Sequence, residues 1–273
     1  MAILLTITFA FAIAAYIFSK PYVRTLKRNS IKQKPFTKAW RKIIQRRIPY
    51  FNQMPADLQL QLKQHIQIFI SEKKFIGCNG INITDEIKVT IAAQACLLLL
   101  NKNTNYYPKL RTILVYPSAF VKKHQQLNVD GTQSLQSIAL AGESWGFGRI
   151  VLSWQDSLAG AEQPNDGHNL VIHEFAHQLD QENGVANGAP ILGKNQDYKT
   201  WSDVFNKQFS LLQHQVSLGQ ASLFDKYGAT NPAEFFAVAS EVFFEQAKLL
   251  SIQYPLFYRQ MSAYYRVDPT NWQ

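Results

Sequence analysis

The chain has 273 residues, of which 47% are apolar and 13% aromatic, so it can bury a large core and is not a disordered polypeptide. Its net charge of +9 comes from the N-terminal part of the chain. Residues 1–56 contain Lys and Arg but no Asp or Glu, whereas the remaining residues are close to neutral. The two cysteines, Cys78 and Cys96, exclude a disulfide framework and favour a reducing compartment.

The N-terminal residues 1–18, MAILLTITFAFAIAAYIF, carry no charged side chain. As a helix they extend about 27 Å, just enough for the apolar core of a bilayer. No base precedes the run and no small-residue cleavage site follows it, which favours an anchor over the alternative, a signal peptide. Bases directly after the run place that end in the cytoplasm. We predict a single-pass transmembrane anchor over residues 1–19 in the inner (cytoplasmic) membrane, with the rest of the chain in the cytoplasm.

A basic segment, residues 20–54, follows the apolar run and contains no acid. Such a segment suits either a nucleic acid or a membrane surface. Bases next to an anchor more often contact anionic headgroups, at about 1 kcal/mol per base, and the rest of the chain has no nucleic-acid-binding motif. We therefore predict membrane contact through this segment and no nucleic-acid partner.

Residues 55–273 have the pattern of one folded domain. Helical periodicity covers residues 55–77, and Thr84 is a good N-cap for a second helix with Asp85 and Glu86 in its first turn. Predicted strands follow, then the helix that contains HEFAH, then further helices: strands over 111–117, 135–142 and 148–154, and helices over 201–216, 231–250 and 255–267. This order predicts an α+β fold, mostly helical with a small mixed sheet.

The sequence HEFAH, residues 173–177, lies in an apolar run typical of a buried helix. His173 and His177 share one helix face about 6 Å apart, and each can give a nitrogen to one zinc ion at about 2.0–2.1 Å. Glu174 is offset by about 100°, where a carboxylate can act as general base toward water. Two structural histidines and a solvated glutamate are the alternative, but a buried histidine pair without a metal needs other polar partners. We predict Zn2+ as the cofactor, with Glu174 as the base.

A catalytic zinc site has three protein ligands. The three-histidine pattern HExxHxxGxxH fails here, because Asp180 and Asn183 occupy its glycine and last histidine positions. Two other histidines are weaker candidates for the third ligand. His168 precedes the helix and points elsewhere, and His214 is isolated in the sequence. For Asp180 itself, a role around the metal and a role as a surface acid are both open.

The better candidate for the third ligand is Glu234, on a later helix. It follows Asn231 and Pro232, which suit an N-cap and a first helical residue, so it falls in the first turn. A glutamate from a second helix that completes a two-histidine site is the gluzincin arrangement. Glu241, two turns further on nearly the same face, either orients a ligand imidazole or is a surface acid.

The motifs HEFAHQLD and NPAEFFAVASEVFF resemble the Mlc titration factor A (MtfA) family of zinc metallopeptidases. TDEIKVTIAAQACLLLLN, GESWGFGRIVLSW and DGHNLVIHE are similar to that family as well, so the resemblance covers residues 55–265. It extends to the catalytic domain of anthrax lethal factor, in which the glutamate of an EFFA motif is a zinc ligand. The apolar N-terminal run is a difference from the soluble members of the family, which lack such a run.

The resemblance implies a zincin-like metallopeptidase domain with His173, His177 and Glu234 as zinc ligands and Glu174 as the base. It also implies that Tyr227 directs its phenol into the site, where a donor can stabilise charge on the substrate carbonyl. Aminopeptidase-like activity on peptides and binding to the transcriptional repressor Mlc are further implications of the same resemblance.

Substrate recognition is predicted at residues 148–154, as an edge strand that pairs with an extended peptide, although an interior strand is the alternative. The main functional hypothesis is a membrane-tethered zinc peptidase. A protein that sequesters a regulator, and a metal-free membrane scaffold, are the other hypotheses. The presence of Glu174 favours the peptidase, because a purely structural metal site has no use for a base.

Overall fold

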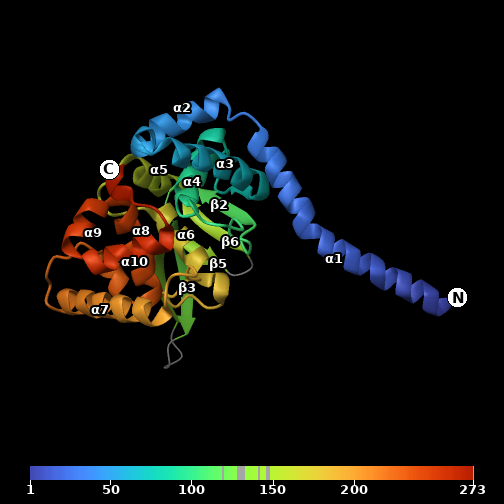
Figure 1. Cartoon of the computed structure of the whole chain (residues 1–273). Coiled ribbons are helices and arrows are strands. Elements are labelled where there is room, and N and C mark those ends of the chain that lie inside the picture. The colour runs from blue at the N-terminus through green and yellow to red at the C-terminus, as the bar shows by residue number, and fades with distance from the viewer. Residues whose placement is uncertain (119, 128–132, 141, 146–147, 273) are drawn as a thin grey trace.

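The computed structural model describes residues 1–118, 120–127, 133–140, 142–145 and 148–272. For residues 2–8, 10–15, 17, 120–127, 133–140 and 142–145, only the backbone is considered. Helices surround a small sheet, and one long helix projects from the body (Figure 1). The helices are α1 (Ala2–Gln33), α2 (Lys38–Arg47), α3 (Ala56–Glu72), α4 (Asp85–Leu97), α5 (Trp154–Glu162), α6 (Leu170–Asp180), α7 (Tyr198–Ser217), α8 (Pro232–Glu245), α9 (Ala247–Gln253) and α10 (Pro255–Tyr265), with short 3-10 helices η1 (Pro49–Gln53), η2 (Gln181–Asn183), η3 (Lys226–Ala229) and η4 (Pro269–Asn271).

The main sheet has the strand order β1-β2-β6-β5. Strands β1 (Lys74–Gly77), β2 (Thr112–Tyr116) and β6 (Arg149–Ser153) are parallel, and β5 (Gly142–Trp145) is antiparallel to β6. A separate antiparallel hairpin is formed by β3 (Phe120–Leu127) and β4 (Gln133–Leu140). The predicted α+β fold with a small mixed sheet is confirmed.

Three predicted elements differ from the observed ones. The single helix predicted over 231–250 is divided at Gln246 into α8 and α9. The helix predicted over 55–77 ends at Glu72, because Lys74–Gly77 pair with β2 as the strand β1. The strand predicted over 148–154 is not at the edge of the sheet: β6 lies between β2 and β5, and its residues Ile150–Leu152 are buried. Such a continuous apolar run is typical of an interior strand. The edge strands of this sheet are β1 and β5.

The hydrophobic core includes most of α4, whose residues Ile87 and 89–97 are buried. Thr84 begins this helix as predicted, and its hydroxyl accepts a hydrogen bond from the amide of Ile87 (3.3 Å). Ile44, Ile48 and Phe51 also belong to the core. The core therefore begins N-terminal of residue 55 and includes α2 and η1.

The N-terminal helix α1 runs without interruption past Pro21 to Gln33 and extends away from the body (Figure 1). Arg28 anchors its C-terminal part through hydrogen-bonded ion pairs with Glu72 (2.7 and 2.9 Å) and a contact with Asn105 (3.2 Å). The described side chains include no helix long and apolar enough to cross a membrane. The transmembrane prediction is thus not supported by this search, and it falls mostly on residues 2–8, 10–15 and 17, whose side chains lie outside the described part.

Candidate metal centre

Helix α6 positions the HEFAH residues through a strong N-cap and a buried apolar face. The side chain of Asn169 accepts a hydrogen bond from the amide of Ile172 (2.9 Å), which satisfies a free amide of the first turn. Val171, Ile172 and Phe175 are fully buried. Because this face is fixed in the core, the opposite face, with both histidines, is turned toward α8.

Helix α8 brings Glu234 to the histidines. The side chain of Asn231 accepts hydrogen bonds from the amides of Ala233 and Glu234, both at 3.0 Å, and Pro232 occupies the first turn. This is the start that the sequence predicts for the helix. Glu234 consequently leaves the first turn of α8 toward α6, with which α8 packs closely.

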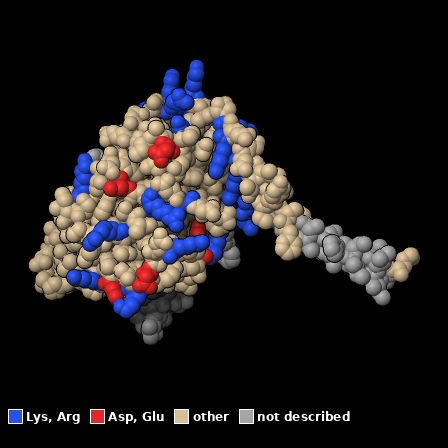
Figure 2. All heavy atoms as spheres, in the orientation of Figure 1, with Lys and Arg blue, Asp and Glu red and all other residues tan. Residues whose placement is uncertain are grey.

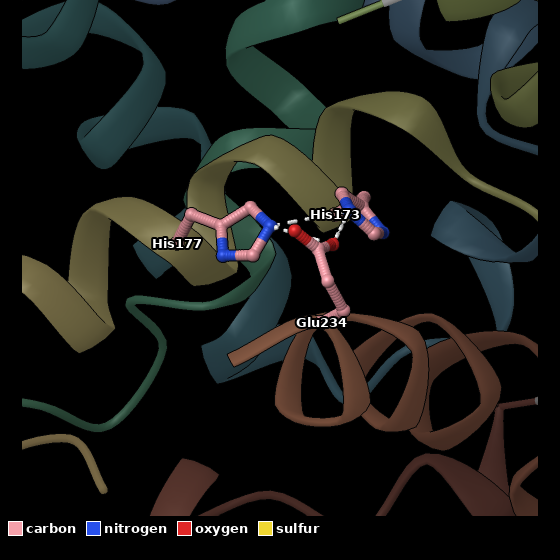
Figure 3. Close-up of side chains that lie close together, drawn as sticks. All are labelled: His173, His177 and Glu234. Carbon is pink, nitrogen blue, oxygen red and sulfur yellow. Dashed lines mark hydrogen bonds and ion pairs between the residues drawn. The ribbon is translucent and has the colours of Figure 1, made fainter. Parts of the chain in front are cut away.

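His173, His177 and Glu234 converge on one point, as Figure 3 shows. The Nε2 atoms of the two histidines are 3.2 Å apart, and the same Oε2 atom of Glu234 lies 3.1 Å from one and 3.2 Å from the other. Three atoms that carry electron pairs thus form a nearly equilateral triangle. His168 and His214 are exposed and do not belong to it.

The triangle has the dimensions of a tetrahedral zinc site. Zinc bound at about 2.0–2.1 Å to each of three tetrahedral ligands keeps the ligand atoms about 3.3 Å apart. The observed separations of 3.1 to 3.2 Å match this value closely. Two imidazole nitrogens and one carboxylate oxygen are also a ligand set that zinc accepts. The residues present therefore fit the metal.

Glu241 orients the first histidine. Its Oε1 atom lies 2.7 Å from Nδ1 of His173, and its Oε2 atom accepts a hydrogen bond from the amide of Asn169 (2.6 Å). A proton on Nδ1 that is held by this carboxylate leaves Nε2 of His173 facing the triangle, where a metal ion would take the place of the second imidazole proton. Glu241 is only 6% exposed, so the surface-acid alternative is excluded.

Electrostatics hold the triangle ready for a cation. Burial lowers the pKa of His173, but hydrogen bonds with Glu234 and Glu241 outweigh it and raise the pKa to about 10. Burial likewise raises the pKa of Glu234, but hydrogen bonds with His173 and His177 outweigh that effect and lower it to about 2. Glu234 is therefore a carboxylate at neutral pH, and positive charge at the triangle is stabilised.

Glu174 lies next to the triangle and is 5% exposed. Burial raises its pKa to about 7, with His173 and His177 opposing the rise and Glu234 and Glu241 adding to it. Among the described residues, none forms a hydrogen bond with its buried Oε2 atom. A carboxyl group with a pKa near neutrality and a free oxygen can both accept and release a proton at neutral pH.

Tyr227, in η3, stands at the open side of the site. Its ring centroid is 6.0 Å from that of His173, and its side chain is more than half exposed. Burial raises the pKa of its phenol, and the charges of Glu234 and Glu174 raise it further. The phenol therefore keeps its proton at neutral pH and is available as a hydrogen-bond donor.

Asp180 supports the loop after α6 rather than the metal. It is fully buried, and its Oδ2 atom accepts a hydrogen bond from the amide of Gly188 (2.8 Å). Gly188 has φ +76°, and a Cβ atom there would lie 2.4 Å from the carbonyl oxygen of Pro232. Only glycine allows this approach, so the loop is fixed beside the start of α8 and next to Glu234.

Sequence reasoning missed a second link between α8 and the start of α6. Glu245 accepts hydrogen bonds from the side chain of Asn169 (2.9 Å) and from the amide of Gly167 (3.1 Å). Glu234, Glu241 and Glu245 all face α6, at spacings of seven and four residues. That spacing was a visible signal of a shared helix face, but it did not reveal which residues lie opposite.

Comparison with known proteins agrees with this geometry. The family described as "Glucose-regulated metallo-peptidase M90" matches residues 23–266. The chain is 40% identical over 267 residues to the uncharacterized protein slr2042 of Synechocystis sp., covering 97% of each chain. It is 30% identical over 226 residues to Mlc titration factor A of Salmonella agona, covering 82% of this chain and 84% of the relative. The corresponding protein of Salmonella arizonae is 31% identical over 229 residues, with 82% and 89% covered.

Fold, site and relatives together define a metallopeptidase-like protein. The chain belongs to the glucose-regulated metallopeptidase M90 family. Its similarity to proteins named Mlc titration factor A confirms the resemblance predicted from the sequence.

Proposed function

We propose that the protein is a zinc-dependent peptidase that hydrolyses peptide bonds, with aminopeptidase-like activity. The observation that carries the proposal is the triangle of Nε2 of His173, Nε2 of His177 and Oε2 of Glu234, whose sides match tetrahedral zinc. These three residues are the proposed ligands. When bound, zinc supplies Lewis acidity for the activation of water and of the peptide carbonyl.

The chain supplies the proton transfers. Glu174 accepts a proton from the attacking water and passes it to the leaving amine. A pKa of about 7 suits both steps, because the carboxyl group changes protonation state near the working pH. Tyr227 donates a hydrogen bond to the carbonyl oxygen as negative charge develops on it. Glu241 keeps the imidazole of His173 in the orientation that the site requires.

Substrate binding is assigned to the edge strand β5. This strand contacts α6 and uses one side for its pairing with β6. An extended peptide added to its other side would lie along α6 with its backbone hydrogen bonds satisfied.

Replacing the base tests the peptidase proposal. Glu174→Gln preserves the size of the side chain and the three ligands but cannot accept a proton. We expect it to keep one equivalent of zinc by elemental analysis and to lose at least about 100-fold in hydrolysis of a panel of amino-acid and peptide anilides. Glu182→Gln, the same change on η2 and outside the triangle, is the matched control. Hydrolysis by Glu174→Gln at the wild-type rate would reject the mechanism.

A second candidate function is sequestration of a transcriptional repressor, with peptidase activity secondary. It is favoured by the name of the relatives, Mlc titration factor A. The Glu174→Gln variant separates the two functions as well. If it captures a repressor from cell extract and keeps its effect on gene expression without hydrolysis, sequestration is the biological role.

Tethering of this domain to the inner membrane, with the body in the cytoplasm, is part of the proposal. It is supported by the absence of charge in residues 1–18 and by the bases that follow them. The projection of α1 away from the body agrees with this proposal, because the body does not cover the N-terminal end of the helix and a bilayer could surround it (Figure 1).

A further inference from the structure

A cleft lies between α1 and the body. Its lining residues all precede the metal ligands in the sequence. Its volume is about 600 Å³, and we call it the basic cleft. One wall is the middle of α1, with Lys20, Arg24 and Lys27. The other wall is formed by the end of α3 and the segment before β2, with Lys73 and Arg111.

Positive charge in the basic cleft is not balanced by the protein. Glu72 is the one acid among the cleft-lining residues, and both of its oxygens are engaged by Arg28. Within the described part of the chain, no carboxylate lies within ion-pair distance of the three α1 bases or of Arg111. Figure 2 shows Lys and Arg gathered on the side of the body from which α1 departs.

The arrangement of the three α1 bases is itself unfavourable without an anion. Lys20, Arg24 and Lys27 follow one another at spacings of four and three residues, so they share a helix face. Like charges at these spacings destabilise a helix. An anion between α1 and the body would remove this repulsion and would meet Arg111 from the opposite wall.

The cleft is held open by fixed contacts. Arg28, one residue beyond Lys27, joins α1 to Glu72 and Asn105 of the body. On the facing wall, Nζ of Lys73 donates hydrogen bonds to the carbonyl oxygens of Tyr107 (2.8 Å) and Leu110 (2.7 Å). These contacts set the distance between the walls before a ligand arrives.

We infer that the basic cleft binds the phosphate group of an anionic ligand. Guanidinium groups bind phosphate oxygens in pairs, and ammonium groups add point charges. The volume is larger than a bare phosphate requires, and Tyr16 and Ser19 line the end of the cleft nearest the apolar run. A phospholipid with an anionic headgroup therefore fits best, because its chains can follow α1 away from the body.

The test uses the full chain in detergent micelles, so that it depends neither on tethering nor on zinc. Short-chain phosphatidylglycerol, short-chain phosphatidylcholine and soluble glycerol phosphate are titrated, and binding is followed by native mass spectrometry and by the shift in melting temperature. We expect saturable binding of phosphatidylglycerol, no comparable binding of phosphatidylcholine, and weaker binding of glycerol phosphate. Equal binding of glycerol phosphate would support the cleft with a soluble phosphate ester as its ligand.

Charge-matched variants locate the binding. The triple variant Lys20→Gln, Arg24→Gln, Lys27→Gln is expected to weaken phosphatidylglycerol binding by about tenfold or more. Arg111→Gln should weaken it from the other wall. The control Lys38→Gln, Arg41→Gln, Lys42→Gln removes the same two Lys and one Arg from exposed positions on α2, and should change binding by less than about twofold.

Two results would overturn the inference. One is an equal loss in the cleft and control triple variants, which would show diffuse attraction to the basic segment. The other is that neither phosphatidylglycerol nor glycerol phosphate binds in a saturable way. Peptide hydrolysis is not measured in these experiments, so a failed lipid test and a failed peptidase test are separate outcomes.

Discussion

At the scale of single residues, the metal centre depends on carboxylates with different tasks. Glu234 remains charged because two histidines donate to it, and Glu174 has a pKa near neutrality because it is buried. Glu241 connects Nδ1 of His173 with the amide of Asn169. The same side-chain chemistry thus suits three different proposed roles, a metal ligand, a base and an orienting group, according to burial and partners alone.

Glu241 is expected to matter for zinc affinity more than for folding. In Glu241→Gln the uncharged amide still fills the space between His173 and Asn169, but the imidazole loses its anionic partner. We expect zinc affinity to fall about 10- to 100-fold in a chelator competition assay. Glu245→Gln, four residues further on α8, is the control and should bind zinc nearly as the wild type does. Unchanged affinity in Glu241→Gln would show that Glu241 has only a packing role.

At the scale of elements, α8 determines the start of α6. Glu245 accepts hydrogen bonds from Asn169 and Gly167. Burial raises its pKa to about 9, with Asp166 and Glu241 adding to the rise and Asn169 opposing it. The folded protein therefore retains a proton on Glu245 at neutral pH, while the unfolded chain loses it near the ordinary value of 4.5.

This difference predicts how stability depends on pH. The contribution of Glu245 is complete below about pH 4.5 and is lost as the pH rises through about 9, because the folded state binds the extra proton between these values. From pH 6 to 8.5 the free energy of unfolding should fall by about 3 kcal/mol more in the wild type than in Glu245→Gln, because the folded state holds nearly one extra proton across most of this range. Urea unfolding in the presence of a chelator measures this without a contribution from zinc. Parallel pH profiles for the two proteins would contradict the assignment.

At the scale of the whole molecule, the chain divides its charge between a basic N-terminal segment and a nearly neutral body. Part of the basic segment is neutralised by the body, since Arg46 and Arg47 both pair with Glu86 and Arg28 pairs with Glu72. The bases of α1 that line the basic cleft are not neutralised in this way. The N-terminal segment therefore both packs on the core and leaves charge available to a ligand.

Removal of residues 1–19 tests whether the protein is tethered. We expect the full chain to stay in the membrane pellet after alkaline carbonate extraction and the truncated chain to be soluble, because the uncharged run is the proposed anchor. The Lys38→Gln, Arg41→Gln, Lys42→Gln variant should remain in the pellet, as it keeps the run intact. Release of the full chain by carbonate would show that its membrane contact is peripheral.

Local signals in the sequence were enough for much of the site. The spacing of His173 and His177, and the Asn231–Pro232 start of α8, depend on neighbours along the chain and are visible without a structure. The position of β6 inside the sheet was not visible, because strand order depends on pairing between distant segments. The partners of Asp180 and Glu245 were hidden for the same reason: their spacing defines a helix face but not the loop packed against it.

The triangle takes its atoms from α6 and α8 alone, and the chain between them, residues 181–231, contributes no ligand although it forms the loop at Gly188 and the η3 turn with Tyr227. The three candidate ligands are thus encoded outside this stretch, whereas Tyr227, the proposed hydrogen-bond donor, is encoded within it. A graft of the loop around Gly188 from a homologue, with Tyr227 kept, would leave all three candidate ligands and the proposed donor in place, so any change in peptide preference would be assigned to that loop.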